Sequence, residues 1–233
     1  MQSDMPCAVV TGCSSGIGRA IAERLLADDW EVIGVQRGQA DIDHPAFSTQ
    51  RCDLTDGEEV DRLAAKLDTP RAVVHASGVL RPGGLGDLQP ADGALMWRLH
   101  VEAATRLANT LLPRMAATGR GGRMVLLGSR VSAGTPGRSQ YAASKAALIA
   151  LARSWASEVV AKGITVNVVS PAATDTAMLA DPARASTQPK VPPMGRLIRP
   201  DEIAALVAFL VSDIAAPITG QDIQVCGGSS LPR

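Results

Sequence analysis

Tyr141 is the only tyrosine of this 233-residue chain, and Lys145 follows it by four residues. The segment 141–151 is rich in alanine and leucine and is typical of a helix, so both side chains should share one helical face. A phenol titrates near ~10 in water and is a poor acid–base catalyst at neutral pH, but a neighbouring ammonium lowers its pKa. The pair therefore indicates a proton-transfer device. The alternative is a half-buried tyrosine beside a surface lysine.

The rest of the composition indicates one large α/β domain over residues 1–233. The chain is 46% hydrophobic but only 3% aromatic, so small aliphatic side chains must fill the core. Its 23 basic and 23 acidic residues cancel, which argues against a nucleic-acid or membrane-surface partner. The first residues resemble no signal peptide, and no apolar stretch reaches the ~20 residues of a membrane span. We expect a cytoplasmic protein.

Metal binding and disulfides are not expected. The four cysteines are scattered, without a CxxC motif or a Cys/His cluster, so reduced thiols are the natural interpretation.

Short apolar runs alternate with amphipathic stretches along the whole chain. Predicted strands cover residues 8–11, 31–35, 47–52, 72–75, 123–127, 165–170 and 222–225, and predicted helices cover 16–28, 56–67, 91–117, 140–161 and 200–212. Strands that are almost continuously apolar and alternate with helices predict a parallel sheet covered on both faces.

A glycine-rich turn joins the first predicted strand to the first helix. It reads Thr11-Gly12-Cys-Ser-Ser-Gly16-Ile17-Gly18. Glycines let backbone approach a ligand closely, and the N–H groups at a helix N-terminus favour a phosphate. The turn indicates a dinucleotide site, although its glycine spacing differs from the common motif and a tight strand–helix connection would also use such residues.

The residues after the second strand bear on the choice of cofactor. An acidic residue there would hold the 2′-hydroxyl of NAD, and an arginine would accept the 2′-phosphate of NADP. The chain has Gln36 and Arg37, which favours NADP over NAD. Arg37 as a solvated turn residue is the alternative, and Asp41 or Asp43 would serve NAD if their loop folded back.

Taken in order, these motifs closely resemble the short-chain dehydrogenase/reductase family, in its single-domain branch. The resemblance also includes segments 52–55 and 218–221, Gly78, Ser129 and Ser170-Pro171, and it covers essentially the whole chain. It implies a Rossmann-type doubly wound parallel sheet of about seven strands. It also implies an NAD(P)-dependent oxidoreductase that moves a hydride between the cofactor and a carbonyl or secondary alcohol.

Family roles can be transferred to matching positions. Tyr141 corresponds to the general acid–base, Lys145 to the lysine that binds the nicotinamide ribose and lowers the tyrosine pKa, and Ser129 to the serine that hydrogen-bonds the substrate. Ser132 and Ser139 are rivals to Ser129 by residue type. Cofactor contacts are implied for Gly12, Ser14, Ser15, Gly16, Ile17, Gly18, Gln36, Arg37, Asp53, Leu54, Ala76, Ser77, Gly78, Tyr141, Lys145, Pro171, Ala172, Thr174 and Thr176. Asp53 would bind the adenine ring, or instead cap the helix near Asp56.

Three positions depart from the family pattern. The usual Asn-Asn-Ala-Gly is His75-Ala76-Ser77-Gly78 here, and the glycine after Pro171 is Ala172. The fourth catalytic residue of the family is an asparagine that holds a water linking the lysine to solvent, and its position is His100. Histidine can hydrogen-bond a water, which would preserve a relay and add pH sensitivity near ~6.5. The alternative is a histidine packed at a subunit contact.

The predicted substrate pocket is bounded by Leu80, Arg130, Val131, Gln140 and Ala172, with a mobile lid over 177–199 whose 177–193 part faces it. Small side chains on the two long helices suit a homotetramer or homodimer. Two other functions compete: a dinucleotide-binding scaffold or regulator without turnover, and an epimerase or dehydratase. The latter fits poorly, since those relatives are longer.

Overall fold

The computed structural model describes residues 5–181 and 190–232. Its centre is a seven-stranded sheet in the order β3-β2-β1-β4-β5-β6-β7, with every neighbouring pair parallel. The strands are Cys7–Thr11 (β1), Glu31–Gln36 (β2), Phe47–Arg51 (β3), Ala72–His75 (β4), Gly122–Leu127 (β5), Ile164–Pro171 (β6) and Asp222–Val225 (β7). The predicted doubly wound parallel sheet is therefore confirmed.

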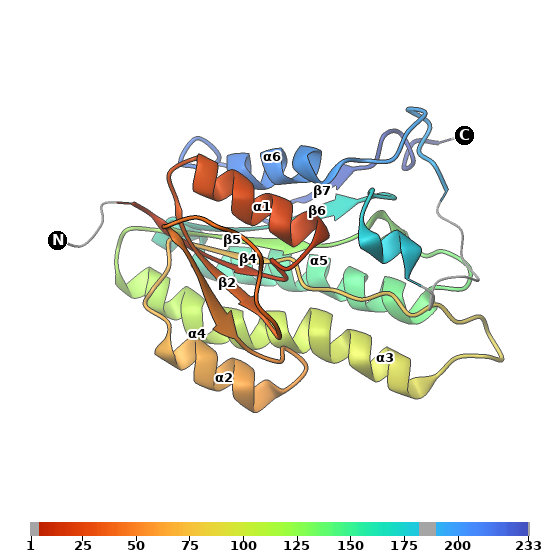
Figure 1. The fold of residues 1–233 in the computed structure, drawn as a ribbon, viewed down its shortest axis with the longest axis horizontal. Helices are drawn as coiled ribbons and strands as arrows, with labels where there is room; N and C mark the ends of the chain where they lie inside the picture. The colour runs from red at the N-terminus through yellow and green to blue at the C-terminus, as the bar shows by residue number, and fades with distance from the viewer. Residues whose placement is uncertain (1–4, 182–189, 233) are drawn as a thin grey trace.

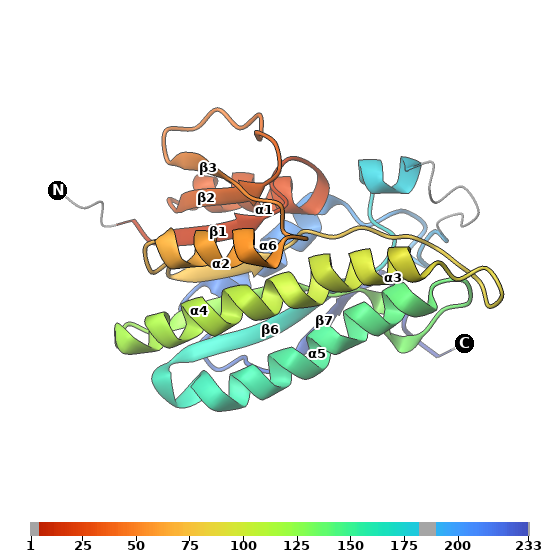
Figure 2. The same ribbon diagram turned by 90° about the horizontal axis from the view of Figure 1, so that it is seen from below.

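Helices cover both faces of this sheet. Helices α1 (Gly16–Ala27) and α6 (Pro200–Val211) lie on one face, above the sheet in Figure 1. Helices α2 (Gly57–Lys66), α4 (Ala103–Ala117) and α5 (Ser139–Val159) lie on the other, in front in Figure 2. The remaining segments are α3 (Pro90–Trp97), the π-helical turn η1 (Arg98–Glu102), and the 3₁₀ turns η2 (Arg130–Ala133), η3 (Val160–Lys162) and η4 (Ala177–Ala180).

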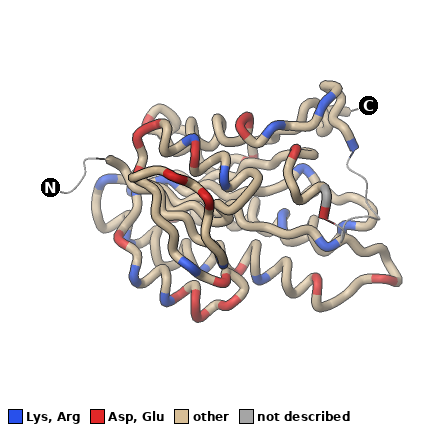
Figure 3. Tube along the Cα trace, viewed as in Figure 1, with Lys and Arg blue, Asp and Glu red and all other residues tan. Residues whose placement is uncertain are grey.

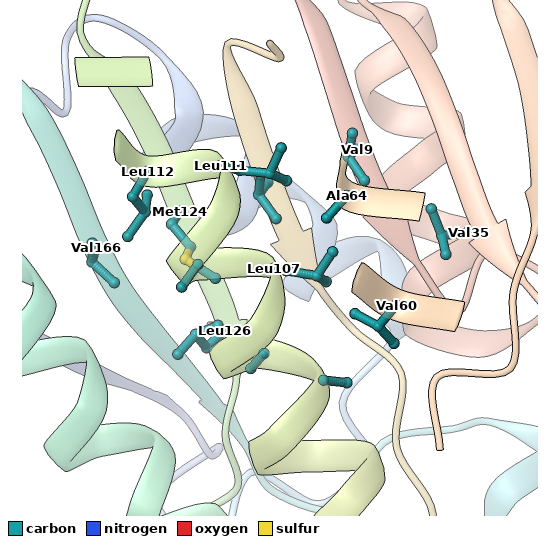
Figure 4. Close-up of a cluster of buried hydrophobic side chains, with 14 of the residues drawn as sticks. Val9, Val35, Val60, Ala64, Leu107, Leu111, Leu112, Met124, Leu126 and Val166 are labelled. Atoms are coloured by element: carbon teal, nitrogen blue, oxygen red, sulfur yellow. The ribbon is translucent and has the colours of Figure 1, made fainter. Parts of the chain in front are cut away.

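Aliphatic side chains fill the layer between the sheet and the lower helices. Leu107 and Leu111 of α4 meet Met124 and Leu126 of β5, and all four are fully buried (Figure 4). Fully burying one such side chain stabilises the fold by about 1.5–3 kcal/mol. This packing explains how a chain with few aromatic residues holds its sheet, and it fixes the helices that carry the site.

The predicted helix over 91–117 differs from the structure at one place. It begins at Pro90 and is interrupted at Arg98–Glu102 by a π turn, where the N–H of Ala103 bonds to the carbonyl of Arg98. A π turn places one extra residue in the helix and often marks a functional position. Here it contains His100.

Charged residues of both signs are interspersed along the chain in Figure 3, in keeping with the equal totals of 23 basic and 23 acidic residues. No helix in 5–181 or 190–232 is long and apolar enough to cross a bilayer. All four cysteines are free thiols, and burial raises the pKa of Cys7, Cys13 and Cys52 to about 11, 12 and 11.

Candidate active site

One large cavity lies at the carboxyl ends of the strands, where ligands bind in open α/β sheets. Its volume of ≈ 1100 Å³ exceeds the roughly 300–1,000 Å³ typical of a single-ligand pocket. Every residue predicted to contact the cofactor lines it, together with Ser129, Tyr141 and Lys145. Among the predicted catalytic and cofactor-binding residues, only His100 is not part of the described lining.

The glycine turn is built around close backbone contacts at one end of the cavity. Gly12 has φ +77°, and a Cβ there would lie 3.0 Å from the Ser77 hydroxyl oxygen. A Cβ on Gly18 would run into the carbonyl oxygen of Gly12. Glycine is therefore required at both positions, and the first turn of α1 can bring its free N–H groups to the cavity wall.

His75 links this turn to the long helix. The Thr11 hydroxyl oxygen accepts the N–H groups of Ala76 and Ser77, both at 3.0 Å, so its hydrogen is free to point at His75 Nδ1, 3.1 Å away. His75 Nε2 then carries the ring hydrogen and donates to the Leu99 carbonyl at 3.0 Å. Burial, with a smaller effect of Lys145, lowers the pKa of His75 to about 4. The imidazole is neutral and structural.

Ser129 is held at the end of β5 with its hydroxyl hydrogen available. It is the N-cap of η2, and its oxygen accepts the N–H of Val131 at 3.2 Å. A hydroxyl that accepts at oxygen can still donate its hydrogen to a ligand. Neither rival serine, Ser132 nor Ser139, lines the cavity.

Lys145 is almost wholly buried, with 4% of its surface exposed. Its Nζ donates to the Leu127 carbonyl at 2.7 Å, which leaves two ammonium hydrogens for a ligand. Nζ lies 5.9 Å from the centre of the Tyr141 ring. Burial lowers the pKa of Lys145 from 10.5 to about 7, so its charge responds to whatever binds beside it.

The observed pair thus differs from a half-buried tyrosine beside a surface lysine. Tyr141 is only 9% exposed, and its ring meets His100 edge to face, with centroids 5.6 Å apart and planes at 87°. Both members of the pair are held by packing on the cavity wall.

His100 is fully buried inside the protomer, which excludes the predicted alternative of a subunit contact. Nε2 accepts the Val79 N–H at 3.0 Å, so Nδ1 carries the ring hydrogen and faces the Ser144 hydroxyl at 2.9 Å. Ser144 in turn donates to the Tyr141 carbonyl at 2.8 Å. Both ring nitrogens are occupied by protein groups, so neither is left for the relay water that the family resemblance implied.

The expected titration of His100 near ~6.5 is also wrong. Burial, with a further contribution from Lys145, moves the pKa of His100 well below 6.5. An ionised ring would lose its acceptor for the Val79 N–H, so the fold selects the neutral form. His100 acts through Val79 and Ser144 and joins the loop after β4 to α5 beside the cavity.

We expect His100→Leu to lower the free energy of unfolding by about 2–4 kcal/mol, because the buried Val79 N–H and Ser144 hydroxyl each lose a partner. The activity of His100→Asn should exceed that of His100→Leu, since an amide can both accept and donate. Urea denaturation and steady-state rates measure both effects. His44→Leu, at an exposed histidine, is the matched control. A step in the wild-type pH–rate profile near pH 6.5 that disappears in His100→Asn would contradict this role.

The adenosine end of the cavity contains an unsatisfied amide. Gln36 is 6% exposed, and within the described residues neither Oε1 nor Nε2 has a hydrogen-bond partner. A buried amide without partners is unfavourable by itself, and a ribose hydroxyl or phosphate would satisfy it. The residues therefore fit a dinucleotide. Asp41 and Asp43, the candidates for binding NAD from a folded-back loop, do not line the cavity.

Asp53 lies beside the same end, and its predicted alternative role is wrong. The N-cap of α2 is Asp56, whose side chain accepts from Glu58 and Glu59. Asp53 instead accepts the N–H and hydroxyl of Thr55 at 2.9 and 2.8 Å, and these bonds lower its carboxyl pKa.

The opposite end holds the predicted substrate pocket, and one predicted wall residue is absent from it. Leu80, Arg130, Val131 and Ala172 line the cavity, but Gln140 does not, because it packs against α3 at Gly93. Of the predicted lid, residues 182–189 lie outside the described residues, while residues 177–179 and Lys190 line the cavity. Sequence reasoning missed Arg81, Leu95, Arg138, Ser229 and Leu231, which also line it. For Ser229 and Leu231, near the C-terminus, no local sequence motif indicated a place in the site.

Comparisons with known proteins agree with this geometry. The family model described as "Enoyl-(Acyl carrier protein) reductase" matches residues 12–230. Two Escherichia coli proteins are each 37% identical over 95% of this chain and 96% of their own: 2,3-dihydro-2,3-dihydroxybenzoate dehydrogenase and a 3-oxoacyl-[acyl-carrier-protein] reductase. A crystal structure of a variant actinorhodin polyketide ketoreductase with NADPH is 25% identical, covers all of both chains and has a TM-score of 0.88.

The family model spans nearly the whole chain, both bacterial relatives are matched almost end to end, and the sheet order and cavity agree with the motifs. The chain belongs to the short-chain dehydrogenase/reductase family of NAD(P)-dependent oxidoreductases.

Proposed function

We propose that the protein is an NADP-dependent carbonyl reductase in which Tyr141 is the acid–base catalyst. The observation that carries this proposal is the shared cavity: Ser129, Tyr141 and Lys145 line the same space as the glycine turn of α1. The names of the relatives include both a dehydrogenase and a ketone reductase, so they support hydride transfer without fixing the substrate.

Each residue has a definite task in reduction. The Tyr141 hydroxyl donates its proton to the carbonyl oxygen as negative charge develops there. The Ser129 hydroxyl donates a second hydrogen bond to that oxygen and stabilises the same charge. Lys145, anchored on Leu127, offers its remaining hydrogens to the ribose and favours the ionised form of Tyr141. When bound, the nicotinamide supplies the hydride.

Cofactor binding is assigned to the residues at the glycine-rich end. The N–H groups at the start of α1 would hold the pyrophosphate, and the unsatisfied Gln36 amide would meet the adenosine ribose. Arg37 would pair with a 2′-phosphate. No acidic residue other than Asp53 lines the described cavity, so no carboxylate at the end of β2 opposes that phosphate.

We expect kcat/KM with NADPH to exceed that with NADH. Arg37→Gln should lower kcat/KM for NADPH by about 10–100-fold, the effect of losing a charged hydrogen bond, and leave NADH unchanged. Gln36→Asp should favour NADH, because its carboxylate repels the 2′-phosphate. Cofactor oxidation with each nicotinamide measures this. Arg62→Gln, on the exposed face of α2, is the control, and equal losses with both cofactors would contradict the assignment.

Turnover on a carbonyl panel, measured beside cofactor binding, tests the function itself. If a ketone or an aldehyde oxidises NADPH, and the reaction is lost when Tyr141 is replaced, the reductase function is supported. Tight NADPH binding with no turnover on the panel would favour a dinucleotide-binding scaffold instead.

A further inference from the structure

The substrate side of the cavity carries several basic side chains. Arg81, Arg130, Arg138 and Lys190 all line it, in addition to the buried Lys145. The only acidic residue among the described lining residues is Asp53, which lies at the adenosine end, close enough to Arg37 for that arginine to lower its carboxyl pKa slightly. No carboxylate among the described lining residues therefore offsets the positive charge of the substrate side.

Arg81 has a partner within the protein. Its Nη1 lies 3.0 Å from a carboxylate oxygen of Asp181, and both side chains are about 30% exposed, at 29% and 31%. The pair is close to neutral as a unit. It ties the loop after β4 to the end of η4, so the charge of Arg81 is already matched by a carboxylate.

Arg130 and Arg138 lie beside the proposed catalytic groups. Arg130 directly follows Ser129 and is the first residue of η2, while Arg138 is the N-cap residue of α5, three residues before Tyr141. Both are partly buried. No hydrogen bond or ion pair joins the Arg130 guanidinium to another described residue. A partly desolvated guanidinium without a counter-charge favours an anion.

Resting on the proposed reductase function, we infer that the substrate carries an anionic group, a carboxylate or a phosphate, which Arg130 binds with support from Arg138 at the substrate end of the cavity. The reacting carbonyl then lies between this anion and the nicotinamide. Leu80, Val131 and Met178, from three separate segments, supply an apolar wall between them.

Arg130 is thus assigned as a specificity-determining residue. A charged hydrogen bond contributes about 1.5–3 kcal/mol, which corresponds to roughly 10–100-fold in affinity. Because the site is open to solvent, added salt should weaken the attraction, as the screening length falls from about 10 Å at 0.1 M to about 3 Å at 1 M.

The test uses matched charged and uncharged ligands with the full-length protein and NADPH. For turnover, acetoacetate is compared with methyl acetoacetate, and acetoacetyl-coenzyme A with the acetoacetyl thioester of N-acetylcysteamine. The first pair tests a carboxylate on the substrate, and the second tests the phosphates of a carrier. For binding, hexanoate is compared with hexanamide by calorimetry on the NADP-loaded protein.

In at least one pair, kcat/KM for the charged member should exceed that for the neutral member by about 10-fold or more. Arg130→Gln should remove that advantage, mostly through KM, without changing the neutral member. Arg130→Gln/Arg138→Gln should remove it further. Arg153→Gln, at an exposed arginine outside this cavity, should behave as wild type.

Different outcomes count against an anionic substrate and against the reductase function. Turnover without preference for either charged member, or equal loss on both members in Arg130→Gln, overturns the anionic substrate and leaves the reductase intact. If no compound turns over, the reductase function fails, and the comparison of hexanoate with hexanamide binding still tests the anion site. Hexanoate binding that is stronger than hexanamide binding and weakened in Arg130→Gln supports the anion site, and equal binding overturns it.

Discussion

Tyr141→Phe should lower kcat by about 10²–10⁴-fold, the usual contribution of a positioned acid–base group. The substitution removes only the phenol oxygen, so the ring can keep its edge-to-face contact with His100 at 5.6 Å. The loss in kcat should therefore far exceed any change in cofactor affinity or melting temperature. Steady-state rates with NADPH and a carbonyl substrate, beside fluorescence titration of NADPH, measure the two quantities separately.

Ser139→Ala provides a matched control on the same helix, since that hydroxyl is exposed and does not line the cavity. Its rate should equal that of the wild type. If Tyr141→Phe kept most of the wild-type kcat, the acid–base catalyst would have to be another group, and the proposed chemistry would be wrong.

Lys145→Met should abolish most of the activity and yet raise the stability of the protein without cofactor at neutral pH. The folded state lowers the pKa of Lys145 from 10.5 to about 7 because burial disfavours the ammonium. Each unit of such a shift corresponds to about 1.4 kcal/mol, so the charged lysine destabilises the empty site by an amount on the order of several kcal/mol. Methionine fills similar space without that charge.

The sign of the pH dependence follows from proton binding. Between about pH 7 and 10.5 the unfolded chain holds a proton on this lysine that the folded chain has released. Stability due to Lys145 therefore rises with pH across that window, and the full penalty is present below about pH 7. The melting-temperature advantage of Lys145→Met should be largest at neutral pH and shrink as the pH rises.

Melting curves of both proteins without cofactor, over that pH range, check this prediction. Lys162→Met, at an exposed lysine, should show no such pH-dependent advantage. A Lys145→Met protein that melts below the wild type at neutral pH would mean that the bond to Leu127, rather than burial, dominates the energetics of this lysine.

Much of the fold was predictable because its signals are local. The observed strands β4 and β7 coincide with the predicted 72–75 and 222–225. Strand β4 is a short, fully buried apolar run of the kind that marks a central parallel strand, whereas β7 alternates polar and apolar residues at the sheet edge. Gly12 and Gly18 marked the dinucleotide turn for an equally local reason: no side chain fits where the chain folds back on itself.

The roles of the two buried histidines could not be read from the chain. The tautomer of His100 depends on Val79 and Ser144, which lie 21 and 44 residues away. Its pKa depends on complete burial, which no local pattern reports. The sequence therefore indicated a residue that could titrate and relay protons. In the fold, His100 is instead a neutral, buried residue that joins two segments by hydrogen bonds.

The sequence by itself determined the element order, the phosphate-binding turn and the catalytic residue types, because each depends on short spacing along the chain. Only the tertiary structure decided that Lys145 is buried with a pKa of about 7. It also decided that the Gln36 amide is buried without a hydrogen-bond partner among the described residues. Finally, it brought Arg130 and Arg138 into one cavity with Leu231, near the C-terminus. Burial and charge are summed over neighbours in space, and most of these neighbours are distant in sequence.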